Sequence, residues 1–96
     1  MRGEEGYALC VLGQISTVQG DYALAATHLQ QSLAIRIETG DVYESARTQL
    51  ALAHLYHAQH DDAQARTFVE HCTPVFKQLG ATLDLADARA LRRQIR

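Results

Sequence analysis

The chain has 96 residues, the length of one small domain, and its 47% hydrophobic and 21% charged residues are typical of a folded protein. Its 9 Lys and Arg stand against 11 Asp and Glu, so no basic excess is available to bind a phosphate backbone, and we expect no nucleic-acid partner. No apolar run approaches the roughly 20 residues of a membrane-spanning helix, and two cysteines are too few for a disulfide framework, so we expect a cytoplasmic protein with no membrane partner.

The composition and the turn signals together predict an all-α chain of five helices. The 15 Ala, 12 Leu and 9 Gln are good helix formers, whereas the β-branched residues are scattered and form no strand-like runs. Glycine readily ends a helix in the left-handed conformation, and aspartate caps the free N–H groups of the next helix. Such turn residues recur every 20 positions, at Gly20-Asp21, Gly40-Asp41, His60-Asp61 and Gly80-Ala81. The predicted helices span about residues 4–19, 22–39, 42–59, 62–79 and 82–95.

Apolar residues at helical spacing mark the inner faces of the second and fourth helices. In the second helix this face comprises Tyr22, Ala25, Ala26, Leu29, Leu33 and Ile37. In the fourth helix it comprises Ala65, Phe68, Val69, Cys72, Val75, Phe76 and Leu79. Because two-residue turns join successive helices, we expect antiparallel hairpins. Pro74 lies within the fourth helix, where we expect it to cause a kink.

The last helix is expected to cap the fold by burying one apolar face. The side chains predicted to point inward are Leu83, Ala86, Leu91 and Ile95. The arginines near its end are expected to face water, where they complement the negative end of the helix dipole. They are Arg89, Arg92, Arg93 and Arg96.

The sequence also repeats at an interval of 40 residues. The matching pairs are Leu12 with Leu52, Ile15 with Leu55, Ala23 with Ala63, Ala25 with Ala65, Leu29 with Val69, and Gly40 with Gly80. A helical hairpin repeated at a fixed period is typical of a helical solenoid.

These residues resemble the tetratricopeptide repeat, whose pattern is W-x₂-L-G-x₂-Y, then A-x₃-F, then P. The first hairpin reads Leu9-x₂-Leu12-Gly13-x₂-Ser16, then Ala25-x₃-Leu29, and the second reads Gln49-x₂-Leu52-Ala53-x₂-Tyr56, then Ala65-x₃-Val69. Leu9 and Ser16 replace the aromatic anchors of the first hairpin, and the repeat is longer than the usual 34 residues. Its length resembles the extended repeats of kinesin light chains and of bacterial multidomain regulators. The resemblance implies an antiparallel helix-hairpin solenoid with repeat 1 at about 4–40, repeat 2 at about 42–80 and a capping helix at about 82–95. Because no helix precedes the first repeat, we expect a fragment of a longer array.

The resemblance further implies a non-catalytic protein–protein interaction module whose first helices line a concave face for a protein or peptide. Carried over position by position, the partner-binding residues are Tyr7, Cys10, Gln14 and Thr17, then Arg47, Leu50, His54 and His57, then Asp87, Ala90 and Gln94. Family members that clamp a terminal carboxylate use Lys and Asn at such positions. Cys10 and Leu50 replace the lysines here, so we do not expect that mode of binding. The alternative is that this stripe is only the exposed side of packed helices.

Histidine is the one residue type whose number suggests catalysis or metal binding. His54, His57 and His60 lie at i, i+3 and i+6, so neighbouring histidines share one side of a helix, although His60 already belongs to a turn. The sequence contains no Gly-rich phosphate loop and no G-x-S-x-G or H-E-x-x-H motif. We expect no enzymatic activity and no cofactor, and a metal site at His54 and His57 is the least favoured alternative.

The first helix suggests a competing role in self-association. Leu9, Leu12 and Ile15 recur at i, i+3 and i+6 on a face that no preceding helix covers. A symmetric dimer would let two such strips cover each other, so we expect a homodimer at high concentration that Leu12→Glu shifts toward monomer. The alternative function is therefore a self-associating or structural scaffold segment of a larger bacterial signalling protein.

Overall fold

The structure consists of five α-helices joined by short turns. In the computed structural model, which describes residues 2–95, the helices are α1 Arg2–Val18, α2 Tyr22–Glu38, α3 Val42–Ala58, α4 Asp62–Leu79 and α5 Thr82–Gln94. Every boundary lies within two residues of the range predicted from the sequence, and the described residues contain no strand, so the all-α prediction is confirmed. None of the described helices is both long and apolar enough to cross a membrane.

Each turn between helices combines a left-handed residue with a capping position. Gly40 has a φ of 72°, and His60 adopts the same conformation at 63°, although a side chain there costs about 1–2 kcal/mol. The side chains of Asp21, Asp41 and Asp61 accept hydrogen bonds from backbone N–H groups three residues on, at 3.3, 3.0 and 3.2 Å. These interactions involve neighbouring residues only, which is why the turns can be predicted from the sequence.

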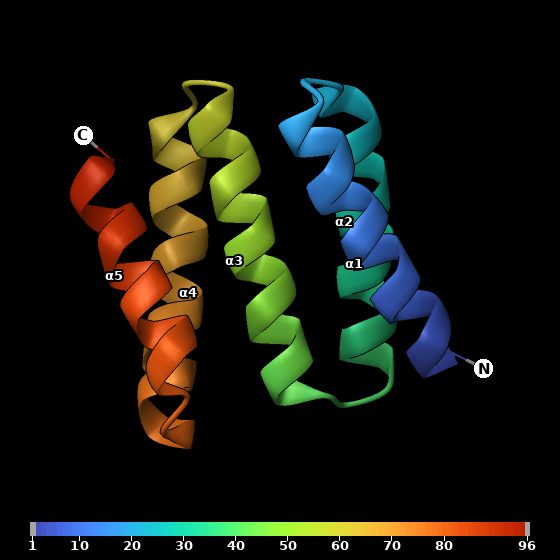
Figure 1. The fold of residues 1–96 in the computed structure, drawn as a ribbon. Coiled ribbons are helices and arrows are strands. Elements are labelled where there is room, and N and C mark those ends of the chain that lie inside the picture. Colours follow the sequence, from blue (N-terminus) through green and yellow to red (C-terminus); the bar gives the residue numbers. More distant parts are fainter. Residues whose placement is uncertain (1, 96) are drawn as a thin grey trace.

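The helices form two layers. Figure 1 shows α1 and α5 in front of α2 and α4, with α3 between them. α1 packs mainly on α2 and α3 mainly on α4, while α2 also packs on α3 and α4 also packs on α5. As a result, α1, α3 and α5 line one face of the molecule, and α2 and α4 form the opposite layer.

Two clusters of buried side chains join the helices. One lies between the hairpins and comprises Ala25, Leu29, Ala51, Leu52 and Leu55. The other joins α3, α4 and α5 and comprises Ala46, Leu50, Ala53, Ala65, Val69, Cys72, Phe76, Ala88, Leu91 and Ile95. Two members of the predicted apolar faces, Ile37 and Leu79, are instead exposed in the last turns of their helices.

The prediction for the buried face of α5 is wrong at two positions. Leu83 is 87% exposed and Ala86 is also exposed, whereas Ala88, Leu91 and Ile95 are buried as one face at i, i+3 and i+7. Ala86 matches Ala46, which is buried in the cluster that α3 shares with α4. Among the described residues no helix follows α5 to cover Ala86 in the same way.

Pro74 does not end the fourth helix. α4 continues through the proline to Leu79, and the Thr73 hydroxyl donates a hydrogen bond to the carbonyl of Val69 at 2.7 Å. The kink expected at this position stays a prediction.

Candidate functional site

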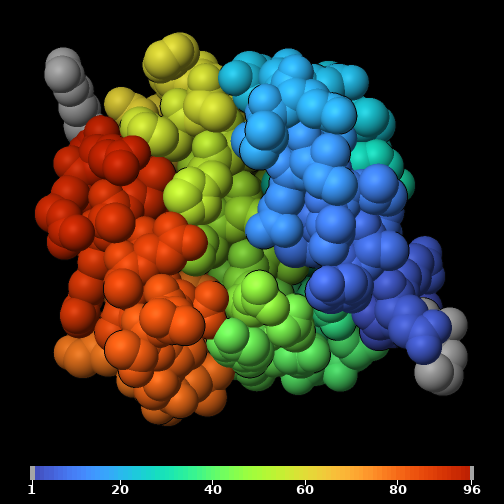
Figure 2. Space-filling view, viewed as in Figure 1, coloured from blue at the N-terminus to red at the C-terminus, as the bar shows by residue number. Residues whose placement is uncertain are grey.

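The face formed by α1, α3 and α5 carries a groove. Figure 2 shows this face, with α3 between the ridges formed by α1 and α5. Three hollows lie along it, and Gln14 of α1 lines all three, so they adjoin one another. We refer to these three hollows together as the inner groove.

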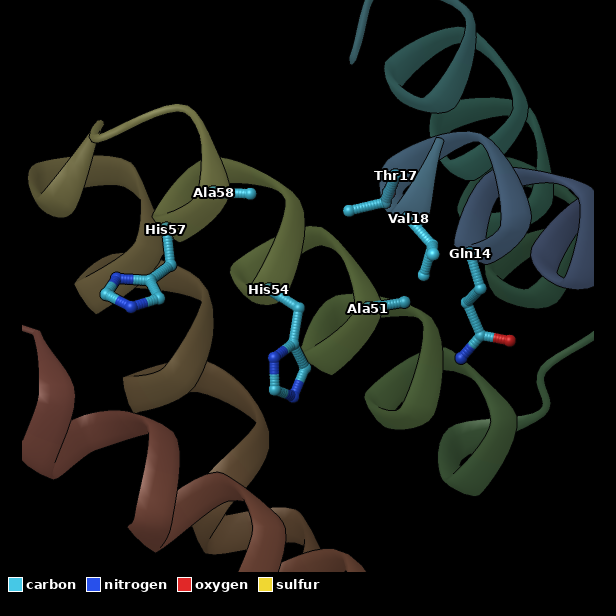
Figure 3. A pocket seen from close by; sticks show the side chains of 7 residues that line it. All are labelled: Gln14, Thr17, Val18, Ala51, His54, His57 and Ala58. Carbon is cyan, nitrogen blue, oxygen red and sulfur yellow. The ribbon is translucent and has the colours of Figure 1, made fainter. Parts of the chain in front are cut away.

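The largest hollow of the inner groove lies between α1 and α3 and has a volume of about 450 Å³. Its lining residues are Gln14, Thr17, Val18, Ala51, His54, His57 and Ala58. Figure 3 shows Ala51 and Ala58 pointing from α3 toward the side chains of α1. Because these two α3 residues are alanines, the space between the helices remains open and its floor is apolar.

The two smaller hollows are more polar. One, of about 70 Å³, lies toward α5 and is lined by Gln14, Arg47, Leu50, Ala51, His54, Asp84 and Asp87. The other, of about 90 Å³, lies toward the start of α1 and is lined by Tyr7, Cys10, Val11, Gln14, Glu44 and Arg47. The inner groove therefore has an apolar end and a charged end.

Ion pairs across the inner groove hold its charged side chains in place. Arg47 contacts Glu44 at 3.4 Å and Asp84 at 3.8 Å, which ties α3 to α5. The Tyr43 hydroxyl donates a hydrogen bond to Asp84, and this bond holds the pKa of the phenol above its ordinary value. Contacts within the chain thus hold Arg47, Glu44 and Asp84, which we call the charged rim of the inner groove, in place.

A second link between α3 and α5 joins His54 to Asp87. The imidazole Nε2 lies 3.0 Å from the Asp87 carboxylate, and both side chains are about half exposed. The contact leaves His54 at the boundary between the apolar hollow and the hollow beside α5.

Most of the residues predicted to bind a partner line the inner groove. They are Tyr7, Cys10, Gln14, Thr17, Arg47, Leu50, His54, His57 and Asp87. Gln94 and Ala90 line none of the three hollows. Leu50 is only 5% exposed because its side chain belongs to the core, so it contributes packing rather than contact area.

The sequence pattern missed several residues of the inner groove. They are Val11, Val18, Glu44, Ala51, Ala58 and Asp84. Each lies within four residues of a predicted position on the same helix, so a wider helical stripe would have included them.

A family model of the tetratricopeptide repeat matches residues 5–78, which include most of α1 to α4. The chain belongs to the tetratricopeptide repeat family. Such repeats generally mediate protein–protein interactions, bind proteins or peptides, and are typically non-catalytic. No curated protein and no solved structure matches the chain. The resemblance to the extended repeats of kinesin light chains and bacterial regulators stays a prediction.

His54 and His57 of this tetratricopeptide repeat chain contact two different carboxylates. His57 Nδ1 lies 3.5 Å from Asp62 without hydrogen-bonding geometry, while His54 pairs with Asp87 on the other side. His60 is exposed in its turn. Within residues 2–95, no three His, Cys, Asp or Glu side chains gather in a way that could hold a metal ion. The geometry gives the His54–His57 metal site no support.

The two cysteines are packing residues of the repeat and should react slowly. Burial raises the pKa of the Cys72 thiol from 9.0 to about 12 and also raises that of Cys10. We expect iodoacetamide at pH 8 to leave Cys72 unmodified in the folded chain, to label Cys10 slowly and to label both in urea, as counted by mass spectrometry. Rapid labelling of Cys72 without denaturant would contradict the assignment of this residue to the packed interior.

The raised pKa of Cys72 also makes the stability of the chain depend on pH. Because the folded chain retains the Cys72 proton that the unfolded chain releases, the free energy of unfolding should fall as the pH rises from about 9 toward 12.

Proposed function

We propose that the chain is a non-catalytic binding module that docks a peptide or a protein segment in the inner groove. The observation that carries this proposal is the apolar hollow of about 450 Å³, which opens directly onto a charged rim. A hollow of this size holds one or two large side chains of a ligand. Burying each such apolar side chain makes the free energy of binding more favourable by about 1.5–3 kcal/mol.

The polar residues of the inner groove suit the main chain of the ligand. The Gln14 amide beside the apolar hollow can donate and accept hydrogen bonds. The Thr17 hydroxyl already donates to the Gly13 carbonyl at 2.9 Å, so it can accept a hydrogen bond from the ligand. Arg47, Asp84 and the His54–Asp87 pair are held by contacts between α3 and α5. Because these groups are already ordered, binding costs less side-chain entropy.

The proposal predicts that filling the apolar hollow weakens binding. Ala58→Leu adds three carbon atoms at the hollow. The probe is a peptide selected from a displayed random library against the wild-type chain. It should bind the variant at least about tenfold more weakly, because the loss of only two buried methylene contacts already lowers the affinity by that factor. Affinity is measured by isothermal calorimetry. Ala34→Leu, which adds the same atoms on the exposed surface of α2, is the matched control and should bind like wild type. Selected peptides that bind Ala58→Leu and wild type equally well would show that the inner groove is not the site.

A further inference from the structure

The charges of the inner groove are unbalanced. The described residues that line it include three carboxylates, Glu44, Asp84 and Asp87, but a single guanidinium, that of Arg47. A groove whose walls carry mainly one sign of charge attracts a ligand of the opposite sign and repels one of the same sign. The inner groove therefore favours a positively charged ligand.

The guanidinium of Arg47 is already neutralised within the chain. It contacts Glu44 at 3.4 Å and Asp84 at 3.8 Å, and it lies over the Tyr43 ring at 5.8 Å from the centroid. An acidic ligand would have to compete with both carboxylates for this one cation. Arg47 therefore does not provide a free site for an anion.

The carboxylate of Asp87 is in a different position. Within residues 2–95 it is paired with no lysine or arginine, and its contact is the His54 imidazole. That contact uses Oδ1 of the carboxylate, which leaves Oδ2 for a ligand. Asp87 is about half exposed and lines the hollow of about 70 Å³ beside α5, so a ligand can reach it.

The arginines of α5 lie on other sides of that helix and do not neutralise Asp87. Because successive residues are about 100° apart around a helix, Arg89 and Arg92 lie about 160° and 140° from Asp87. Arg93 lies about 120° away by the same rule. Arg92 contacts Glu70 of α4 at 4.0 Å. The groove side of α5 is thus acidic, although the helix as a whole is rich in arginine.

The acidic hollow directly adjoins the apolar hollow. Gln14, Ala51 and His54 line both of them. Figure 3 shows the His54 ring pointing from α3 toward α5, away from α1. In an extended peptide, side chains two residues apart share one face and are about 6–7 Å apart. One short segment can therefore place an apolar side chain in the first hollow and a charged one in the second.

We propose that the ligand of the inner groove is a peptide segment in which a large apolar residue is a close neighbour of a lysine or arginine. The apolar side chain fills the hollow between α1 and α3, and the cationic head group pairs with Asp87. Leu50 and Ala51, which line the acidic hollow, contact the aliphatic stem of the cationic side chain. This inference rests on the proposed function and adds the charge of the ligand to it.

The outer edge of α1, on the side away from α3, is a separate surface that carries the exposed side chains of Leu12 and Ile15. The self-association predicted from Leu9, Leu12 and Ile15 stays a prediction, and sedimentation of the unliganded chain tests it. Affinities are measured at a concentration at which the chain sediments as one species, so that dimerisation does not enter the binding constant.

The test starts from peptides selected from a displayed random library against the wild-type chain. Those whose binding is weakened by Ala58→Leu occupy the inner groove. Relative to the starting library, they should be enriched in lysine or arginine beside a large apolar residue and depleted in acidic residues. Each is then synthesised with an acetylated N-terminus, so that a terminal amine cannot supply the charge. It is made in its original form and with the cationic residue changed to glutamine or to glutamate.

Substitutions of Asp87 then identify the partner of the cation, with affinities measured by calorimetry and folding checked by circular dichroism. Asp87→Asn should weaken binding of the original peptide about three- to tenfold and leave that of the glutamine form nearly unchanged. Asp87→Lys should reverse the preference, so that the glutamate form binds more tightly than the original peptide. Glu70→Gln removes the same charge from an exposed site on α4 and is the matched control, with a change of less than about twofold.

Two results would overturn this proposal and leave the binding function intact. One is a set of peptides that depend on Ala58 but carry no excess of lysine or arginine. The other is an equal effect of Asp87→Asn and Glu70→Gln, which would mean that the net charge of the chain acts rather than Asp87. If no selected peptide depends on Ala58, the proposed function itself fails, and the assignment of the ligand fails with it.

Discussion

Phe76→Ala is expected to lower the free energy of unfolding by about 3–5 kcal/mol, a large part of the total stability of a domain this size. The Phe76 side chain is fully buried in the cluster that joins α3, α4 and α5. Its ring also meets the Tyr43 ring edge to face, with centroids 6.3 Å apart. Truncation therefore removes contacts to three helices at once and leaves a cavity that a helical scaffold cannot easily close.

Urea unfolding followed by circular dichroism measures this loss. The midpoint should fall with little change in the denaturant slope, because the surface exposed on unfolding stays nearly the same. Tyr7→Ala is the control, since Tyr7 is 61% exposed, and it should change stability by less than about 0.5 kcal/mol. A loss of under about 1 kcal/mol for Phe76→Ala would mean that the three helices are not held together through this ring.

Gly13→Ala is expected to destabilise the first hairpin by about 1–3 kcal/mol, although alanine is the better helix former. A Cβ atom at residue 13 would lie 2.5 Å from Cγ of Leu29, so the leucine side chain would have to move. The second hairpin has Ala53 at the position that matches Gly13, and the smaller Val69 at the position that matches Leu29, in the same buried cluster. The two hairpins thus use two compatible pairs, glycine with leucine and alanine with valine.

A double-mutant cycle tests this pairing. Gly13→Ala should cost markedly less in a Leu29→Val background, since the shorter side chain leaves room for the added methyl group. Gly3→Ala is the matched control, because no atom lies within 4 Å of a Cβ built there, and it should stabilise the chain by up to about 1 kcal/mol. Equal costs for Gly13→Ala in both backgrounds would show that Leu29 is not what limits residue 13.

The residues of the inner groove were predicted from the sequence in outline, but the ion pairs between them were not. The helical stripe through Gln14, Arg47 and His54 places these side chains on one face, because the spacing of a helix fixes which residues share a side. The pairing of His54 with Asp87 depends on how closely α5 approaches α3, and no local pattern states that distance. The contacts of Asp84 with Tyr43 and Arg47 could not be predicted for the same reason, since these partners lie about 40 residues away in the chain.

The sequence by itself determined the five helices and their ends, because left-handed turn residues and aspartate caps act through neighbours within four positions. It also predicts a repeat of 40 residues, because matching residue types recur at that interval in the sequence. Only the tertiary structure decided which apolar side chains are covered. Leu12 and Leu52 are the same residue type at the same place in the repeat, yet the first is 46% exposed and the second is fully buried. The difference arises because burial depends on whether a neighbouring helix is present, and α2 covers α3 whereas no described helix covers the outer edge of α1.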